Sequence, residues 1–164
     1  MNKLVSTQIE QRLNQHTKWE KESAEIYESM ATWCRFNGFN NVASFFFKHA
    51  DEERGHGRKI VNYLDEKECL AVIPALEQPD TSGYKSMRSL FEQAYEHEMF
   101  VTNTYKELAT MALKEGDHDT YGFALTFLSE QREELNLYSE YLDKLQLLGD
   151  GAQAAYLFDH DFAD

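Results

Sequence analysis

Acidic, amide and histidine side chains recur in this sequence at one fixed interval. Matched positions 78 residues apart are Glu20 and Glu98, Glu53 and Gln131, and His56 and Glu134. On a helix, positions three or four residues apart lie on one face, so Glu53 and His56 present an oxygen and a nitrogen donor together. Such donor sets bind divalent metal ions. The sequence therefore predicts two related helical hairpins, each with potential metal ligands near its middle.

The composition favours one domain built from long helices. The chain has 164 residues, with only two prolines and eight glycines, so residues 1–164 are expected to form a single domain. The net charge of −13 argues against nucleic acid or an anionic membrane as a partner, because both attract clustered lysine and arginine. No apolar run approaches the ~18 residues that a membrane span needs. Cys34 and Cys69 form no CxxC pair, which favours a cytoplasmic location.

Helix boundary signals predict four long helices and a short fifth. Thr7, followed three residues later by a glutamate, predicts a capping box, and Ser86 can cap the third helix. Gly38 and Gly116 mark tight turns between antiparallel neighbours. The stretch 69–85 is expected to be a long crossover that makes helices two and three parallel. The predicted helices cover about residues 7–36, 41–68, 86–116 and 117–148, with a minor helix within 150–164.

The donor side chains interrupt otherwise apolar core-facing stripes at one height in the bundle. Two residues of an antiparallel pair face each other when their midpoint falls at the turn. The midpoint of Glu20 and His56 is position 38, and that of Glu98 and Glu134 is position 116; both positions are turn glycines. The sequence therefore places these four side chains at the same level.

Four carboxylates at one buried level need a counter-charge. Two unit charges about 4 Å apart repel by ~4 kcal/mol at an effective dielectric constant of about 20, and burial adds a desolvation penalty. Because the core-facing stripes contain no lysine or arginine, either several carboxylates are protonated or cations bind among them. Two divalent cations would balance Glu20, Glu53, Glu98 and Glu134. Oxygen ligands with one imidazole favour iron or manganese over zinc.

The remaining histidines are more typical of packing than of ligation. His16 and His49 are expected to be core histidines away from the centre, and His97 is expected to be exposed. Tyr27 lies two helical turns after Glu20 on the same face, so its hydroxyl is a further candidate for the site.

Longer motifs around these positions resemble the ferritins, and within them the bacterial non-haem ferritins. The motifs are Trp19-Glu20 with Tyr27, Ala31 to Cys34, His49 to His56, Tyr95 to Glu98, and Ser129 to Glu134. The resemblance covers nearly the whole chain and implies a ferritin-like four-helix bundle with one di-iron domain over residues 1–164. It also implies a ferroxidase that oxidises Fe(II) with dioxygen or peroxide. The ferric product would be stored as mineral inside a hollow homo-oligomeric shell of 24 subunits.

The resemblance further implies which residues bind iron. Glu20, Glu53 and His56 would bind the first iron, Glu98 and Glu134 the second, and Glu53 would bridge the two. Tyr27 and these five ligands form the expected catalytic set.

Four more residues complete the implied set. Gln131 would bind the second iron or hydrogen-bond beside it. Glu52, Glu130 and Glu133 match positions that form, with Glu134, a third iron site in some bacterial ferritins. The alternative for these three is a solvated acidic face.

Two departures from related proteins refine the expectation. Di-iron oxidases and rubrerythrins usually carry ExxH twice, whereas the second copy here runs from Gln131 to Glu134. One nitrogen ligand is therefore missing, and we expect the second iron to be held less firmly and passed on to storage. Bacterioferritins place a haem-ligating methionine directly after the glutamate of the first ExxH. This chain has Arg54 there, so no haem is expected.

Two other classes of function remain compatible with the sequence. A di-iron oxidase or peroxidase without storage predicts a small oligomer and an apolar channel to the metals. A structural bundle with protonated central carboxylates predicts no stoichiometric iron binding.

Overall fold

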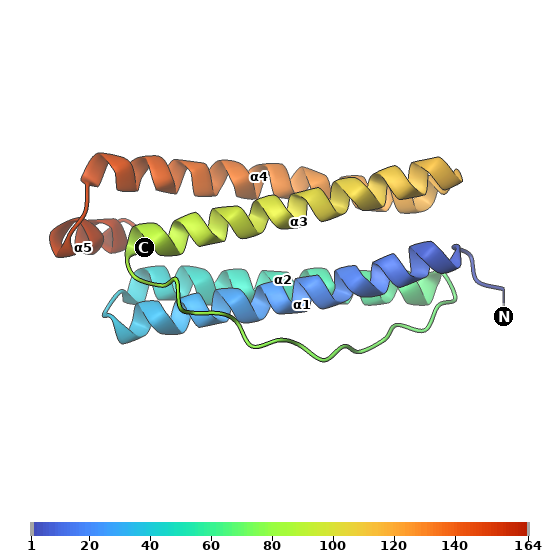
Figure 1. The fold of residues 1–164 in the computed structure, drawn as a ribbon, viewed down its shortest axis with the longest axis horizontal. Coiled ribbons are helices and arrows are strands. Elements are labelled where there is room, and N and C mark those ends of the chain that lie inside the picture. The colour runs from blue at the N-terminus through green and yellow to red at the C-terminus, as the bar shows by residue number, and fades with distance from the viewer. Residues whose placement is uncertain (1, 164) are drawn as a thin grey trace.

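A computed structural model describes residues 2–163, which form five helices and no strand (Figure 1). The helices are α1 (Thr7–Phe36), α2 (Asn40–Glu66), α3 (Met87–Glu115), α4 (His118–Leu148) and α5 (Ala152–His160). Helices α1 and α2 form one antiparallel hairpin, α3 and α4 form a second, and α5 lies at the end of the bundle where α3 begins. The prediction of an all-α four-helix bundle with a short C-terminal helix is confirmed.

Side-chain caps set the starts of the long helices. The Ser6 hydroxyl accepts a hydrogen bond from the Ile9 N–H, so Ser6 caps α1 and the predicted cap at Thr7 is wrong by one residue. Ser86 caps α3 as predicted, and the Ser89 hydroxyl accepts from the Ser86 N–H to complete a capping box. These bonds satisfy N–H groups that have no partner within the helix.

Two glycine turns fix how each hairpin folds back. Gly38 has φ of 86° and Gly116 has φ of 72°, a left-handed conformation that a Cβ atom disfavours. Helix α2 ends at Glu66, two residues before the predicted boundary, because the chain turns there and Glu68 adopts φ of 58°.

The crossover of residues 67–86 runs the length of the bundle beside α1, so α2 and α3 are parallel as predicted (Figure 1). It is held by hydrogen bonds to α1 side chains. The Val72 N–H donates to Asn14 at 2.7 Å, and the Glu77 N–H donates to Glu22 at 3.3 Å.

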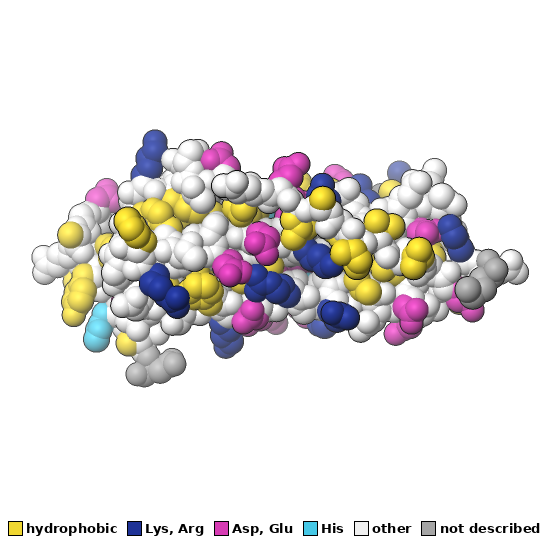
Figure 2. Space-filling model, turned by 90° about the horizontal axis from the view of Figure 1, so that it is seen from below, with side chains coloured by type: hydrophobic (Ala, Val, Ile, Leu, Met, Phe, Trp, Pro, Cys, Tyr) yellow, Lys and Arg dark blue, Asp and Glu magenta, His cyan; other side chains and the backbone are white. Residues whose placement is uncertain are grey.

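Apolar side chains are exposed on the face along which the crossover runs. Figure 2 shows them beside acidic and basic side chains. Leu70 is 84% exposed and Ile73 is 72% exposed. Exposed apolar side chains grouped in this way are typical of protein contact surfaces. No helix within residues 2–163 has the length and apolar character needed to cross a membrane.

The core consists of two apolar clusters with a polar layer between them. One cluster, toward α5, includes Met30, Phe46, Phe91, Tyr138 and Phe158. The other, toward the N-terminus of α1, includes Ile9, Leu13, Ile60, Leu108 and Phe127. The buried polar side chains Glu20, Glu53, Glu98 and Gln131 lie between the clusters. Apolar packing on both sides keeps water from these groups and makes their ionisation costly.

Candidate metal centre

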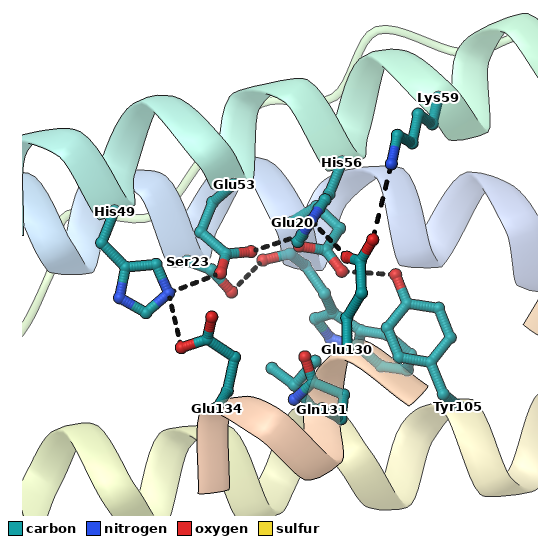
Figure 3. Close-up of polar contacts among 12 residues, drawn as sticks. Glu20, Ser23, His49, Glu53, His56, Lys59, Tyr105, Glu130, Gln131 and Glu134 are labelled. Carbon is teal, nitrogen blue, oxygen red and sulfur yellow. Dashed lines mark hydrogen bonds and ion pairs between the residues drawn. The ribbon is translucent and has the colours of Figure 1, made fainter. Parts of the chain in front are cut away.

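The polar layer brings together side chains from all four long helices (Figure 3). Helix α1 contributes Glu20, α2 contributes Glu53 and α3 contributes Glu98, and each is at most 3% exposed. The matched heights predicted from the turns are confirmed, because carboxylates far apart in sequence converge here.

One group of possible ligands contains Glu20, Glu53 and His56. Their donor atoms all lie within 4.8 Å of one another. His56 Nδ1 is 3.6 Å from Glu20 Oε2 and 3.3 Å from Glu53 Oε2. This is the set that the resemblance to ferritins implies for the first cation, and its spacing suits one shared ion.

A second group contains His49, Glu53 and Glu98, again within 4.8 Å. Glu53 belongs to both groups, which is the geometry that a bridging carboxylate requires. Gln131 Nε2 donates to Glu98 Oε2 at 2.7 Å and approaches Thr102 Oγ1 at 3.2 Å. In this structure Gln131 therefore orients a carboxylate.

His49 lies at the centre, so the expectation that it is a core histidine away from the site is wrong. Its Nε2 is 3.1 Å from Glu53, 3.5 Å from Glu134 and 3.7 Å from Glu98. Burial alone would lower the pKa of His49, but these three carboxylates raise it to about 9. His49 lies one turn before Glu53, so its height along α2 alone places it outside the centre. The i to i+4 spacing to Glu53 was the available signal.

Two tyrosines hold the outer carboxylates crosswise. Tyr27 on α1 donates to Glu98 on α3, and Tyr105 on α3 donates to Glu20 on α1. Contact between the Tyr27 hydroxyl and a predicted ligand is thus found. Tyr105 was not identified from the sequence, although it follows Tyr27 by the same 78 residues that separate the two glutamates.

Burial shifts the pKa values of three of the four central carboxylates upward. The exception is Glu53: burial would raise its pKa, but its hydrogen-bonding contacts with Glu20, His49 and His56 lower it to about 2. Burial and the neighbouring Glu53 carboxylate raise the pKa of Glu20 to about 8. Burial raises the pKa of Glu134 to about 7 and also raises the pKa of Glu98. Burial would lower the pKa of His56, but its contacts with Glu20 and Glu53 raise it to about 11. In the absence of a cation, protons must therefore neutralise part of the cluster.

The donor atoms fit divalent cations. Two buried atoms that point into the cluster, Glu20 Oε2 and His49 Nε2, make no well-aligned hydrogen bond. Among residues 2–163, no lysine or arginine forms an ion pair with any of the four central glutamates. Lys59 instead approaches Glu130 at 3.6 Å, on the rim. Buried carboxylate oxygens and imidazole nitrogens that lack a lysine or arginine partner are typical ligands of iron or manganese.

The residues predicted for a third site line one hollow of about 250 Å³ on the α2 and α4 side. Its lining comprises Glu52, His56, Glu130, Glu133 and Glu134. The tight donor set there is His49 with Glu52 and Glu134. Glu130 instead contacts His56 Nε2 at 2.7 Å. The third site remains a prediction.

The two other histidines differ from each other. His16 is buried and stacks on Tyr105 with ring centroids 4.4 Å apart, as expected of a core histidine. The expectation that His97 is exposed is wrong, because it is half-buried and its Nε2 is hydrogen-bonded to Ser23 Oγ at 2.7 Å. Burial lowers the pKa of His97 to about 4.

The bundle and its carboxylate-rich centre define a class of four-helix metal-binding proteins. The family model described as "Ferritin-like domain" matches residues 10–148, and this chain belongs to the ferritin family.

Related sequences agree with this assignment. The chain is 37% identical to a "Probable bacterial non-heme ferritin-like protein" of Haemophilus influenzae, covering 98% of this chain and 97% of that protein. It is 33% identical to a "Bacterial non-heme ferritin" of Campylobacter jejuni, covering 95% and 93%.

Solved structures also agree. An open pore ferritin from Archaeoglobus fulgidus superposes with a TM-score of 0.92 at 30% identity, covering 96% of each chain. Chlorobium tepidum ferritin superposes with a TM-score of 0.85 at 34% identity, covering 96% of this chain and 95% of that one.

Proposed function

We propose that this chain is the subunit of an iron-storage protein that oxidises Fe(II) to Fe(III) at two adjacent positions. The observation that carries the proposal is the position of Glu53, which belongs to two separate donor groups at the centre of a buried carboxylate cluster. A carboxylate shared in this way can hold two cations side by side.

The first Fe(II) would bind Glu20, Glu53 and His56, and the second would bind Glu53, Glu98 and Glu134. Each Fe(II) supplies one electron. Two electrons and two protons reduce dioxygen to hydrogen peroxide, and the same number reduce peroxide to water. The negative carboxylates favour the Fe(III) product because it carries the higher charge.

The side chains around the ligands orient them and manage protons. Tyr27 and Tyr105 donate to Glu98 and Glu20. Gln131 donates to Glu98. Because protons neutralise part of the metal-free cluster, cation binding must release protons. The apolar clusters on either side exclude water, which strengthens the electrostatic hold on the substrate iron.

We propose that the product leaves through the acidic hollow beside α4. Glu52, Glu130 and Glu133, with Glu134, would form a third iron position on the way to a storage cavity.

Arg54 pairs with Asp51 at 3.0 Å and stands where a haem-ligating methionine would be needed, so we propose that no haem binds. A Soret band in purified protein would contradict this.

The storage role requires assembly into a closed shell, for which we propose 24 copies. At 19.1 kDa per chain, such a shell has a mass of about 460 kDa. The exposed apolar side chains along the crossover support contacts between subunits. We propose a cytoplasmic location, in agreement with two cysteines that form no disulfide.

Gel filtration combined with an aerobic Fe(II) loading assay tests the proposal. We expect a large assembly that oxidises Fe(II) and retains far more iron than the ligand positions can hold. Glu53→Gln should abolish rapid oxidation while the assembly persists. Glu66→Gln is the matched control, because Glu66 is exposed on the same helix. A small oligomer that oxidises Fe(II) without retaining it would favour a di-iron oxidase, and failure to bind Fe(II) would favour a structural bundle.

A further inference from the structure

The nitrogen donors of the centre are distributed differently from the sequence expectation. Glu134 in the second half of the chain matches His56 in the first half. The sequence therefore predicts no nitrogen ligand for the second cation position. The structure brings His49 to this position from α2. Its side chain is 4% exposed, and its Nε2 atom makes no well-aligned hydrogen bond.

The distances around His49 Nε2 suit a shared cation. Donors around one first-row cation lie about 2.0 to 2.2 Å from it, so two donors are at most about 4.4 Å apart. Nε2 is 3.1 Å from Glu53 Oε1 and 3.7 Å from Glu98 Oε1. Both separations fall within that limit, so a cation can contact all three residues.

The surroundings of the His49 ring orient Nε2 toward the carboxylates. Nδ1 is 2.7 Å from the Tyr138 hydroxyl. The ring stacks on Tyr27, with centroids 4.1 Å apart. If Nδ1–H donates to the Tyr138 hydroxyl, Nε2 can bind a cation once the cation displaces the Nε2 proton, which is the arrangement that metal-binding histidines usually show.

A second histidine shows that burial alone does not produce this arrangement. His16 precedes Glu20 by four residues, just as His49 precedes Glu53. It is also buried and its Nε2 is also unpartnered. Within residues 2–163, however, His16 forms no ion pair and belongs to no donor group.

We propose that His49 is the nitrogen ligand of the second cation, together with Glu53 and Glu98. Each cation of the pair then has one imidazole, and both imidazoles come from α2. The inference rests on the proposed function, because it assigns one more ligand to the same centre.

Anaerobic titration of the assembled, metal-free protein with Co(II) tests the proposal. We expect the wild-type protein to bind two Co(II) per chain tightly. His49→Phe keeps a ring against Tyr27 but removes the nitrogen, so it should weaken the second Co(II) by at least about tenfold. It should leave the first Co(II) at Glu20 and His56 unchanged and alter the Co(II) ligand-field spectrum. The matched variant His16→Phe should preserve both affinities and the spectrum.

A crystal structure of the wild-type protein with Zn(II) provides a readout that does not depend on the folding of a variant. We expect His49 Nε2 about 2.1 Å from the second ion. An ion bound by Glu53 and Glu98 with Nε2 out of bonding distance would overturn the inference, as would two unweakened Co(II) in His49→Phe. Those results would leave the proposed function intact. A wild-type protein that binds no Co(II) or Zn(II) would instead remove both.

Discussion

The two hairpins of the bundle share one plan but contribute unequally to the centre. Helix α2 presents His49, Glu53 and His56 where α4 presents Phe127, Gln131 and Glu134 at the matching positions. Both central imidazoles therefore come from α2, whereas α4 contributes an amide and a carboxylate. The side chain of Glu134 is 22% exposed, whereas Glu53 is buried. Among the matched ligand positions only Glu20 and Glu98 carry the same residue, whereas all three positions compared on α2 and α4 differ.

This difference suggests unequal roles for the two cation positions. Both groups reach the acidic hollow through one ligand, His56 for the first cation and Glu134 for the second. The side chain of Glu134 is the more exposed of the two, at 22% against 15% for His56. We expect the first position to hold iron firmly and the second to exchange it toward the hollow.

The outer carboxylates preserve the internal symmetry more closely. Glu20 and Glu98 each accept a hydrogen bond from a tyrosine of the opposite hairpin. Tyr27 and Tyr105 therefore occupy equivalent positions in the two hairpins. A difference between the effects of substituting them would reflect a difference between the two cation positions.

Removing one outer carboxylate should have the largest effect. We expect Glu20→Gln to eliminate the first tight Co(II) position and Glu98→Gln the second, because each takes away a charged ligand from one group only. Anaerobic calorimetric titration measures the number of ions bound. Fe(II) oxidation should fall sharply in both variants, since a two-electron reduction of dioxygen needs both irons. If both variants lost the same position, the division into two groups would be wrong.

Adding a nitrogen ligand from α4 should make the second cation position retain its iron instead of exchanging it. We expect Glu134→His to tighten the second cation and to slow oxidation after the first iron load, because bound iron leaves less readily. The first turnover should change less than later ones. Stopped-flow oxidation with successive additions of Fe(II) makes this comparison, with Glu140→His as the control at an exposed position farther along α4. Unchanged multi-turnover oxidation would refute the exchange role of this position.

Removing one tyrosine hydroxyl should have a smaller and selective effect. A hydrogen bond to a charged group contributes about 1.5 to 3 kcal/mol, so we expect affinity to fall about tenfold or more at one position. Tyr105→Phe should weaken the ion near Glu20, and Tyr27→Phe the ion near Glu98. The crosswise arrangement would be contradicted if each variant weakened the position on its own hairpin. Co(II) titration of both variants distinguishes the two results.

The smallest effect should be a dependence of metal-free stability on pH. The pKa of Glu20 is raised from 4.5 to about 8 and that of Glu134 to about 7. Burial lowers the pKa values of His16 and His97 to about 3 and about 4, which acts in the opposite direction below about pH 6.5. Above about pH 6.5 the folded state binds more protons than the unfolded state, so the free energy of unfolding should fall as pH rises from about 6.5 to about 8. The raised pKa values of His49 and His56 act in the same direction above about pH 6.5.

Thermal unfolding of the metal-free protein across this range measures the slope. Glu20→Gln should flatten it, because the amide does not ionise, and Glu66→Gln should leave it unchanged. A midpoint that rises with pH in the metal-free wild-type protein would contradict the assigned protonation of the cluster.

The sequence alone determined the helices, their order and the level at which their polar side chains meet. Apolar periodicity and breaker residues act locally, so the turns at Gly38 and Gly116 could be located within a residue or two. The turns then fixed which residues face each other within a hairpin. Glu20 and His56 were paired in this way without any knowledge of the tertiary structure.

The tertiary structure decided which side chains from different hairpins touch. Tyr105 reaches Glu20 across 85 positions, and His49 approaches Glu98 and Glu134 although it lies one turn from the predicted level. His97 is withdrawn from solvent by its contact with Ser23. Helical periodicity specifies a face and a height along one axis. How far a side chain reaches, and toward which neighbour, depends on its rotamer and on the packing of the facing helix, which the spacing of residues does not encode.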